Sequence, residues 1–157
     1  MTERLRGRLT ELRPVTAADN ELLVAWHRDP EVARYWDGKS YTPEEMRDRL
    51  ARPDVDAYVV EAGGRPVGYL QAWRGKAESG GLDMFLVPAA RGRGYGPDAA
   101  RALAQHLAAA GRTPLTVDPY LWNERAISAW RDAGFEPVEE RPPDDEHSAP
   151  WMLMEWR

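Results

Sequence analysis

The feature that most constrains this chain is a glycine-rich loop between an apolar strand and a helix. The apolar stretch at residues 82–87 predicts a buried strand, and the Ala- and Leu-rich stretch at residues 97–110 predicts a helix. Gly92, Gly94 and Gly96 lie between them. Alternate glycines let backbone amides converge, and the helix N-terminus adds the positive end of its dipole. This unit therefore predicts an α/β chain with an anion-binding loop suited to a pyrophosphate.

The loop does not match the two best-known nucleotide-binding motifs. No Gly-Lys-Ser/Thr closes it, as a Walker A loop would require, and its spacing differs from GxGxxG. Arg91 and Arg93 add positive charge that suits phosphate oxygens. The need for a tight connection between strand and helix would by itself explain these glycines. The assignment of the loop to phosphate binding therefore depends on the rest of the chain.

Composition excludes several function classes. The chain has no cysteine, so it has no disulfide, no thiolate metal site and no acyl-cysteine intermediate. The three histidines are far apart and form no zinc-ligand pair, so we expect no metal. A net charge of −5 argues against a nucleic-acid partner and is compatible with a cationic substrate.

The length and hydropathy of the chain predict one domain that does not enter a membrane. A length of 157 residues without a linker fits a single domain over residues 1–157. No apolar run approaches the ~18 residues of a membrane span, and the first residues alternate in charge where a signal peptide would be apolar. We therefore expect a cytoplasmic protein, either a monomer or a homodimer.

Local signals predict the order of the elements. Thr16 and the Thr42-Pro43-Glu44-Glu45 sequence start two helices after a first strand at 9–15, and Gly63-Gly64 joins two strands as a hairpin. Because some strands form hairpins and others alternate with helices, we expect a mixed sheet. The expected strands are 9–15, 58–62, 66–73, 82–87, 115–117, 135–140 and 151–156, and the later helices are 97–110 and 123–133.

Two motifs resemble those of the GNAT acetyltransferase superfamily. One is the Arg-Gly-x-Gly-x-Gly run at 91–96, after a strand that ends in Val-Pro; the other is the Asn-x-x-Ala…Gly-Phe segment at 123–135. The resemblance implies a GNAT fold, with a central mixed, mostly antiparallel sheet of about 6–7 strands flanked by about four helices. It also implies a single acyltransferase domain that uses acetyl-CoA as co-substrate.

The resemblance assigns the coenzyme site to named residues. Backbone amides of Val87, Gly92, Gly94 and Gly96 would hold acetyl-CoA, and Asn123, also a candidate helix N-cap, would contact the pantetheine. The full set of expected coenzyme-binding residues is Phe85, Leu86, Val87, Arg91, Gly92, Arg93, Gly94, Tyr95, Gly96, Asn123 and Ala126.

Two positions depart from the family pattern. Asp98 places a negative charge in the first helical turn, close to the expected phosphates. Trp130 stands where the family commonly has a tyrosine that protonates the leaving thiolate, and an indole donates a hydrogen bond but cannot act as an acid. Tyr120 is the nearest alternative acid in the sequence.

Within the superfamily, the chain is most similar to aminoglycoside 6'-N-acetyltransferases. Gly81-Leu82-Asp83 resembles their Gly-Ile-Asp segment, and Val117-Asp118-Pro119 resembles their Thr-Asp-Pro segment. The stretch from Trp26 to Trp36 resembles their substrate-side helix and loop, although the connection from Trp73 to Asp83 is shorter than theirs. The resemblance implies a cationic small-molecule amine as acceptor.

The residue chemistry supports an acceptor site around Asp83. Direct acetyl transfer needs a neutral amine, so a carboxylate that takes its proton is required. Asp83 interrupts an apolar strand at the expected acetyl position and is the candidate base, with Asp118 as a second catalytic candidate that also suits a turn. The expected acceptor-binding residues are Tyr35, Trp36, Gln71, Asp83 and Asp118.

Three functions fit these observations. The first is N-acetylation of an aminoglycoside by direct transfer in a ternary complex. The second is acylation of another amine, either a siderophore-type hydroxylamine or lysine or a protein N-terminus. The third, suggested by Trp130, is a non-catalytic acyl-CoA-binding module.

Overall fold

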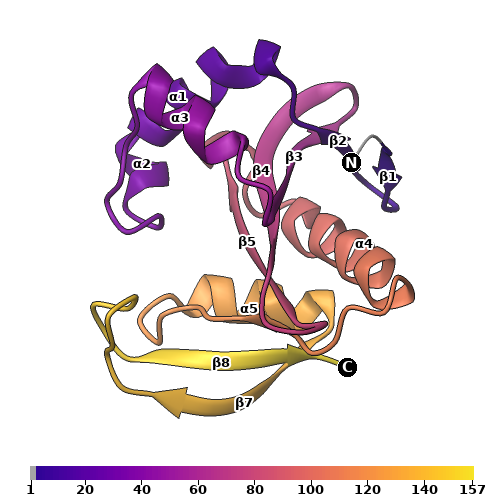
Figure 1. The fold of residues 1–157 in the computed structure, drawn as a ribbon, viewed down its shortest axis with the longest axis vertical. Coiled ribbons are helices and arrows are strands. Elements are labelled where there is room, and N and C mark those ends of the chain that lie inside the picture. The colour runs from indigo at the N-terminus through magenta and orange to yellow at the C-terminus, as the bar shows by residue number, and fades with distance from the viewer. Residues whose placement is uncertain (1–2) are drawn as a thin grey trace.

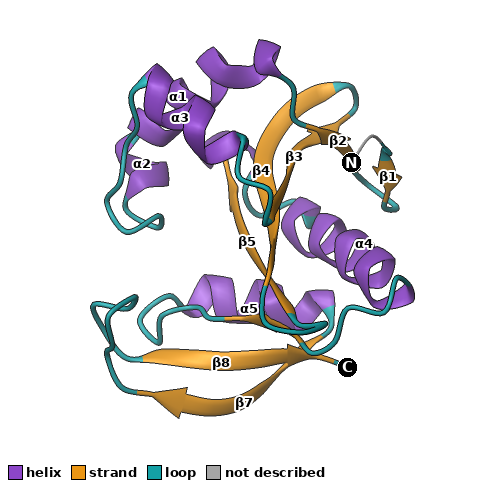
Figure 2. Ribbon diagram, in the orientation of Figure 1, coloured by secondary structure: helices purple, strands orange, loops and turns teal. Residues whose placement is uncertain are grey.

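The computed structural model describes residues 3–157 and contains one mixed sheet of eight strands (Figures 1 and 2). The spatial order of the strands is β1-β2-β3-β4-β5-β6-β8-β7, and only the β5–β6 pair is parallel. The strands are β1 (Leu5–Arg6), β2 (Glu11–Pro14), β3 (Val55–Ala62), β4 (Arg65–Arg74), β5 (Gly80–Leu86), β6 (Leu115–Val117), β7 (Phe135–Arg141) and β8 (Trp151–Trp156).

Helices cover both faces of this sheet. Three short helices lie on one face, and α4 and α5 lie on the other, as Figure 1 shows for α1–α3 and α4. None of the described helices is long and apolar enough to cross a membrane. The α-helices are α1 (Asn20–Arg28), α2 (Pro30–Ala33), α3 (Pro43–Leu50), α4 (Tyr95–Ala109) and α5 (Glu124–Ala133).

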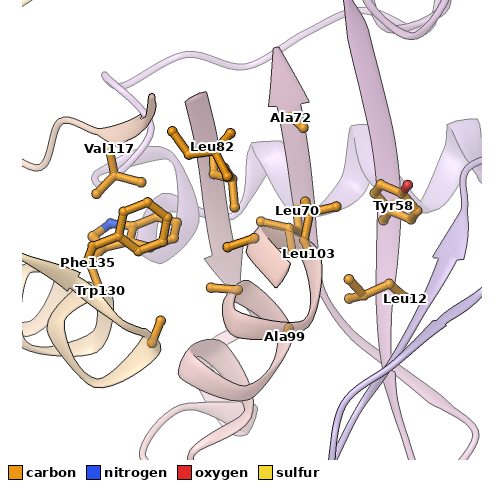
Figure 3. Packing of buried hydrophobic residues seen from close by; sticks show 14 of the residues in the cluster. Leu12, Tyr58, Leu70, Ala72, Leu82, Ala99, Leu103, Val117, Trp130 and Phe135 are labelled. Carbon is orange, nitrogen blue, oxygen red and sulfur yellow. The ribbon is translucent and has the colours of Figure 1, made fainter. Parts of the chain in front are cut away.

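Alternation along the central strands supplies a separate core for each face. Leu70 and Leu82 point toward α4 and α5, where they join a cluster with Leu103 (Figure 3). Tyr69, next to Leu70, and Phe85, three residues after Leu82, belong to the second cluster, under α1–α3. Successive side chains of a strand point to opposite faces, so the two cores follow from the pleat of β4 and β5.

Helix starts follow the expected capping chemistry. The Thr42 side chain accepts from the Glu45 amide, and the Glu45 side chain accepts from the Thr42 amide, which completes a capping box. Asn123 caps α5 by accepting from the Ala126 amide at 3.2 Å. Gly134 ends α5 with a φ of 122°, a conformation that favours glycine.

The predicted mixed, mostly antiparallel α/β sheet is confirmed, but the element count was low. The structure adds β1 and α2, with two and four residues, to the expected elements. Segments of two and four residues are too short to show a repeating pattern of apolar residues, so they cannot be detected in a sequence.

The parallel junction of β5 and β6 is short. These strands pair only through Gly80 with Leu115 and Gly81 with Thr116. Beyond that point β5 continues to Leu86, paired with β4 alone. The edge of β5 from Leu82 onward therefore faces a gap in the sheet.

Candidate active site

A cavity of about 530 Å³ lies beside this gap. The lining comes from the loop after α2, helix α3, the interior of β4 and β5, the segment after β6, helix α5 and the β7–β8 loop. Both acidic and basic side chains line the cavity. The acidic residues are Asp37, Asp83, Asp118, Asp145 and Glu146, and the basic residues are Lys39, Arg49 and Arg52.

Asp83 lies in this cavity because of its position in β5. Leu82 points into the core, so Asp83 points to the opposite face, where it is paired across the strands with Gln71. The Gln71 amide donates to an Asp83 carboxylate oxygen at 3.0 Å. Burial raises the pKa of Asp83 from 3.8 to about 6, with a further contribution from the negative charge of Asp118. Gln71 and Arg49 act in the opposite direction.

Asp118 lines the same cavity from the end of β6, so the structure brings the two predicted carboxylates together. One Asp118 oxygen, Oδ2, lies 2.6 Å from Nε2 of His147. The β7–β8 loop carries His147, which sequence reasoning did not identify as a site residue. Its only sequence signal is a histidine three residues after Asp144 in an acidic loop.

Several aromatic side chains line the cavity. Tyr35 and Tyr120 each pack against Trp122, and the Tyr120 hydroxyl donates to Asp37 at 2.7 Å. Trp36 has two roles, because it lines the cavity and also packs edge-on against Phe85 in the core under α1–α3. The predicted acceptor-side residues Tyr35, Trp36 and Gln71 thus all line the cavity.

Trp130, which stands where the GNAT family commonly has a tyrosine, also lines the cavity, from α5. Its indole is largely buried and packs edge-on against Phe135. Tyr120 is one of three phenols in the same lining, with Tyr35 and Tyr41. Burial raises the Tyr120 pKa, and the hydrogen bond to Asp37 raises it further, so this hydroxyl keeps its proton at neutral pH.

The glycine loop joins β5 to α4 through residues in a left-handed backbone conformation. Gly92 and Gly94 have φ values of 79° and 80°, which favour glycine, and Gly94 is the N-cap of α4. The amides of Gly92 and Gly94 donate to no residue of the described chain. They stand next to the N-terminus of a 15-residue helix, an arrangement suited to phosphate oxygens.

Two details of the predicted coenzyme site differ from expectation. The Val87 amide donates to the Val67 carbonyl at 2.9 Å, so its assignment as a donor to the coenzyme was wrong. Arg91 donates to the carbonyls of Leu86 and Glu31 and lies over the Tyr35 ring, which ties the loop to the acceptor side. Arg93 is the exposed arginine of the loop.

The remaining predicted residues surround the gap. Phe85 is buried in the aromatic core and pairs with Tyr69 of β4, so its peptide groups are directed to β4 and not to the open edge of β5. Gly96 lies against the side chains of Met84 and Leu86. Tyr95 opens α4, and Asn123 and Ala126 line the cavity from the start of α5.

The charge of Asp98 is directed away from the loop. Its carboxylate accepts from the amides of Arg8, Leu9 and Thr10 and from the Thr10 hydroxyl, at 2.7–3.0 Å. Burial raises the pKa of Asp98, but these four hydrogen bonds outweigh it, and the pKa falls below its ordinary value. Asp98 therefore anchors the β1–β2 turn, and its charge is directed to that turn and not to the glycine loop.

Comparison with known families agrees with this geometry. The profile of the acetyltransferase (GNAT) domain matches residues 8–136. The chain belongs to the GNAT acetyltransferases. It is an acetyl-CoA-dependent N-acetyltransferase, and its fold is the GNAT fold.

Relatives of known activity include aminoglycoside-modifying enzymes. The GNAT chain is 29% identical over 146 residues to the aminoglycoside N(6')-acetyltransferase type 1 of Klebsiella pneumoniae, covering 80% of this chain and 73% of that one. A structure of AAC(6')-Ib with paromomycin and acetyl-CoA is 26% identical, with a TM-score of 0.82 over 94% and 93% of the two chains.

A more distant structure shares the fold alone. The ribosomal L7/L12 alpha-N-protein acetyltransferase RimL, in complex with coenzyme A, superimposes with a TM-score of 0.83 at 14% identity, over 98% of this chain and 97% of that one. The GNAT framework is therefore the same among enzymes whose acceptors differ.

Proposed function

We propose that residues 1–157 form a single domain that moves the acetyl group of acetyl-CoA to a primary amine of a cationic small molecule, with aminoglycosides as the first candidates. The observation that carries this proposal is the position of Asp83, a carboxylate with a pKa near 6 in a cavity it shares with Asp118. In this proposal transfer is direct, within a ternary complex, and the absence of cysteine rules out an acyl-cysteine intermediate.

Asp83 is suited to act as the general base. With a pKa near 6 it is ionised at neutral pH and accepts a proton from the acceptor ammonium. The free amine then attacks the thioester carbonyl carbon, the C–S bond breaks, the coenzyme leaves as a thiolate, and the nitrogen of the new amide loses its second proton to solvent. The Tyr120 hydroxyl lines the cavity and is the candidate donor of the proton that this thiolate takes up.

The glycine loop is suited to hold the coenzyme. The free amides of Gly92 and Gly94 and the N-terminus of α4 offer hydrogen-bond donors to a pyrophosphate, and Arg93 offers a charge. The open edge of β5 lies between this loop and Asp83. A coenzyme anchored at the loop would place its thioester along this edge, toward the base.

Five carboxylates in the cavity lining support a cationic acceptor. A relative with 26% identity has been solved with coenzyme A and kanamycin, an aminoglycoside. Polycations are attracted by acidic rims and by aromatic faces such as Tyr35 and Trp36. We therefore rank aminoglycosides first.

The basic side of the cavity supports a second candidate. Arg49 is half-buried, lies over the Tyr41 ring at 4.4 Å, and makes no ion pair within the described chain. An acceptor that carries both an amine and an anionic group could pair with both the acidic and the basic side chains of the cavity. Lysine-type siderophore precursors, which carry an α-carboxylate, and peptides with an acidic residue near the N-terminus are of this type.

The deciding experiment measures thiol release from acetyl-CoA with a panel of amines. The panel contains kanamycin, lysine, N6-hydroxylysine and a short peptide, with the Asp83→Asn enzyme as the control for each. Turnover of kanamycin supports the first candidate, and turnover of lysine derivatives or the peptide supports the second. Acetyl-CoA binding without turnover of any amine would overturn both.

A further inference from the structure

His147 stands between two carboxylates. Its Nε2 lies 2.6 Å from Asp118 Oδ2, and its Nδ1 lies 2.8 Å from Asp144 Oδ1. The His147 side chain is 9% exposed, and its ring stacks on Trp151 at 4.2 Å between centroids and meets the Tyr120 ring in an edge-on contact. This packing fixes the plane of the imidazole and so the directions of both nitrogen atoms.

The two contacts together require an imidazolium ion. A neutral imidazole has one N–H, whereas a carboxylate is only an acceptor, so one contact would lack a proton. Burial lowers the pKa of His147, but the hydrogen bonds to Asp144 and Asp118 outweigh it and raise the pKa above its ordinary value. The other ionisable groups nearby are Asp145 and Glu146 on the same loop, the Tyr120 phenol, and Arg141, which lies over Trp151.

Asp118 uses only one of its oxygens in this contact. Oδ2 accepts from His147, while Oδ1 has no hydrogen-bond partner within the described chain. The Asp118 side chain is 40% exposed and lines the cavity. One oxygen is thus held by the protein and the other remains available to a ligand.

The β7–β8 loop does not depend on this contact for its shape. Asp144 accepts from the amides of Glu146 and His147 and from the Trp151 indole. These bonds organise the loop within itself. The bond from His147 to Asp118 is additional, and it connects the loop to the end of β6.

We propose that His147 is a positioning residue, which as a cation holds the Asp118 carboxylate so that its free oxygen faces the acceptor amine. This inference rests on the proposed function, in which Asp118 belongs to the acceptor side. His147 also offsets the charge of Asp118, and that charge raises the pKa of Asp83. Without His147 the base would therefore be harder to ionise.

The test compares His147→Gln with His106→Gln, using the amine from the panel that is turned over fastest. His106 is half-buried on α4 and does not line the cavity, so its variant controls for the loss of a histidine. We expect His147→Gln to raise the acceptor KM about tenfold, the effect of one charge-assisted hydrogen bond. The KM for acetyl-CoA stays constant, and the acidic limb of the kcat/KM profile moves to higher pH.

A double-mutant cycle separates positioning from a general structural role. If His147 acts through Asp118, adding His147→Gln to Asp118→Asn causes no further rise in acceptor KM. Additive losses, or an acceptor KM unchanged in His147→Gln, would overturn the proposal.

A titration of the free enzyme gives a readout that does not depend on the acceptor. Histidine NMR should place the pKa of His147 above 6.5 in the wild type and lower it in Asp118→Asn. A value at or below 6.5 that does not respond to Asp118→Asn would also overturn the proposal, even if His147→Gln does not fold. Failure of the whole amine panel would instead count against the proposed function, with the titration still readable.

Discussion

The hydroxyl of Tyr69 donates a hydrogen bond to the side-chain carbonyl of Gln71 at 2.8 Å. This bond fixes the orientation of the Gln71 amide, so that its NH₂ group faces Asp83. Tyr69 is itself held in the aromatic core, stacked on Phe85 and packed edge-on by Trp36. The position and ionisation of the candidate base are therefore linked to the packing under α1–α3.

Replacing Gln71 by Met should make Asp83 a weaker acid. The substitution keeps the side-chain length and removes the donor that lowers the Asp83 pKa. Since the base must be ionised, the acidic limb of kcat/KM for the acceptor should move to higher pH by about one unit, the equivalent of one hydrogen bond to a charged group. Tyr69→Phe should cause a smaller shift in the same direction. A shift to lower pH in either variant would contradict this relationship.

Asp83→Asn should lower kcat by about 10²–10⁴, the usual loss for one general base. Acetyl-CoA affinity, measured by calorimetry, should stay constant, because Asp83 faces the acceptor cavity. Near-normal turnover would mean that the proton leaves by another route.

The same variant should be more stable at neutral pH. The Asp83 pKa is raised on folding, so the native state binds the extra proton between pH 3.8 and about 6, and stability falls as pH rises through that window. Asn has no charge to bury, so Asp83→Asn should unfold at a thermal midpoint about 2–4 °C above that of the wild type at pH 7.5. This difference between the two midpoints should vanish near pH 4. A lower midpoint at pH 7.5 would contradict the raised pKa.

Gly94→Val should weaken acetyl-CoA binding by about tenfold or more, because a side chain at the loop obstructs approach to its amides. Gly111→Val is the matched control. Gly111 follows the other end of α4, its φ of 91° is close to the 80° of Gly94, and it too has room for a Cβ. Both variants should lose about 1–3 kcal/mol of stability through backbone strain. Equal acetyl-CoA affinities in the two folded variants would remove the loop from the binding site.

Asp98→Ala should destabilise the fold by about 1–3 kcal/mol, because three turn amides lose their acceptor. The Asp98 pKa is lowered on folding, so its contribution is complete above the unfolded pKa and is lost as pH falls through the lower folded value. The difference in urea midpoint between the wild type and Asp98→Ala should therefore be constant near pH 7 and shrink below about pH 4. A difference independent of pH would indicate that the carboxylate charge is not involved.

The sequence predicted the parts of this enzyme whose signals are local. The Thr42 capping box, the Gly63-Gly64 hairpin and the strand before the glycine loop depend on neighbouring residues, and each lies where it was expected. Asp83 was detectable because a carboxylate within an apolar strand is unusual. These features need no knowledge of distant contacts.

Features that depend on distant pairing could not be predicted. His147 meets Asp118 only because β8 pairs with β6 and brings the β7–β8 loop to the cavity. Arg91 was expected at the phosphates, but its guanidinium binds the Glu31 carbonyl, 60 residues away in the chain. Asp98 turns from the phosphate position for a similar reason, since its partners lie in the β1–β2 turn.

The short pairing of β5 with β6, through two residue pairs, also matters for how the coenzyme would bind and leave in each reaction cycle. These two pairs connect a five-stranded half of the sheet to a three-stranded half, and the β5 edge beyond them keeps unpaired peptide groups. The pantetheine arm of coenzyme A carries two amides, so an arm lying along this edge would pair with it as an added strand does. Donor binding would then complete the sheet, and release of coenzyme A would be the removal of a strand.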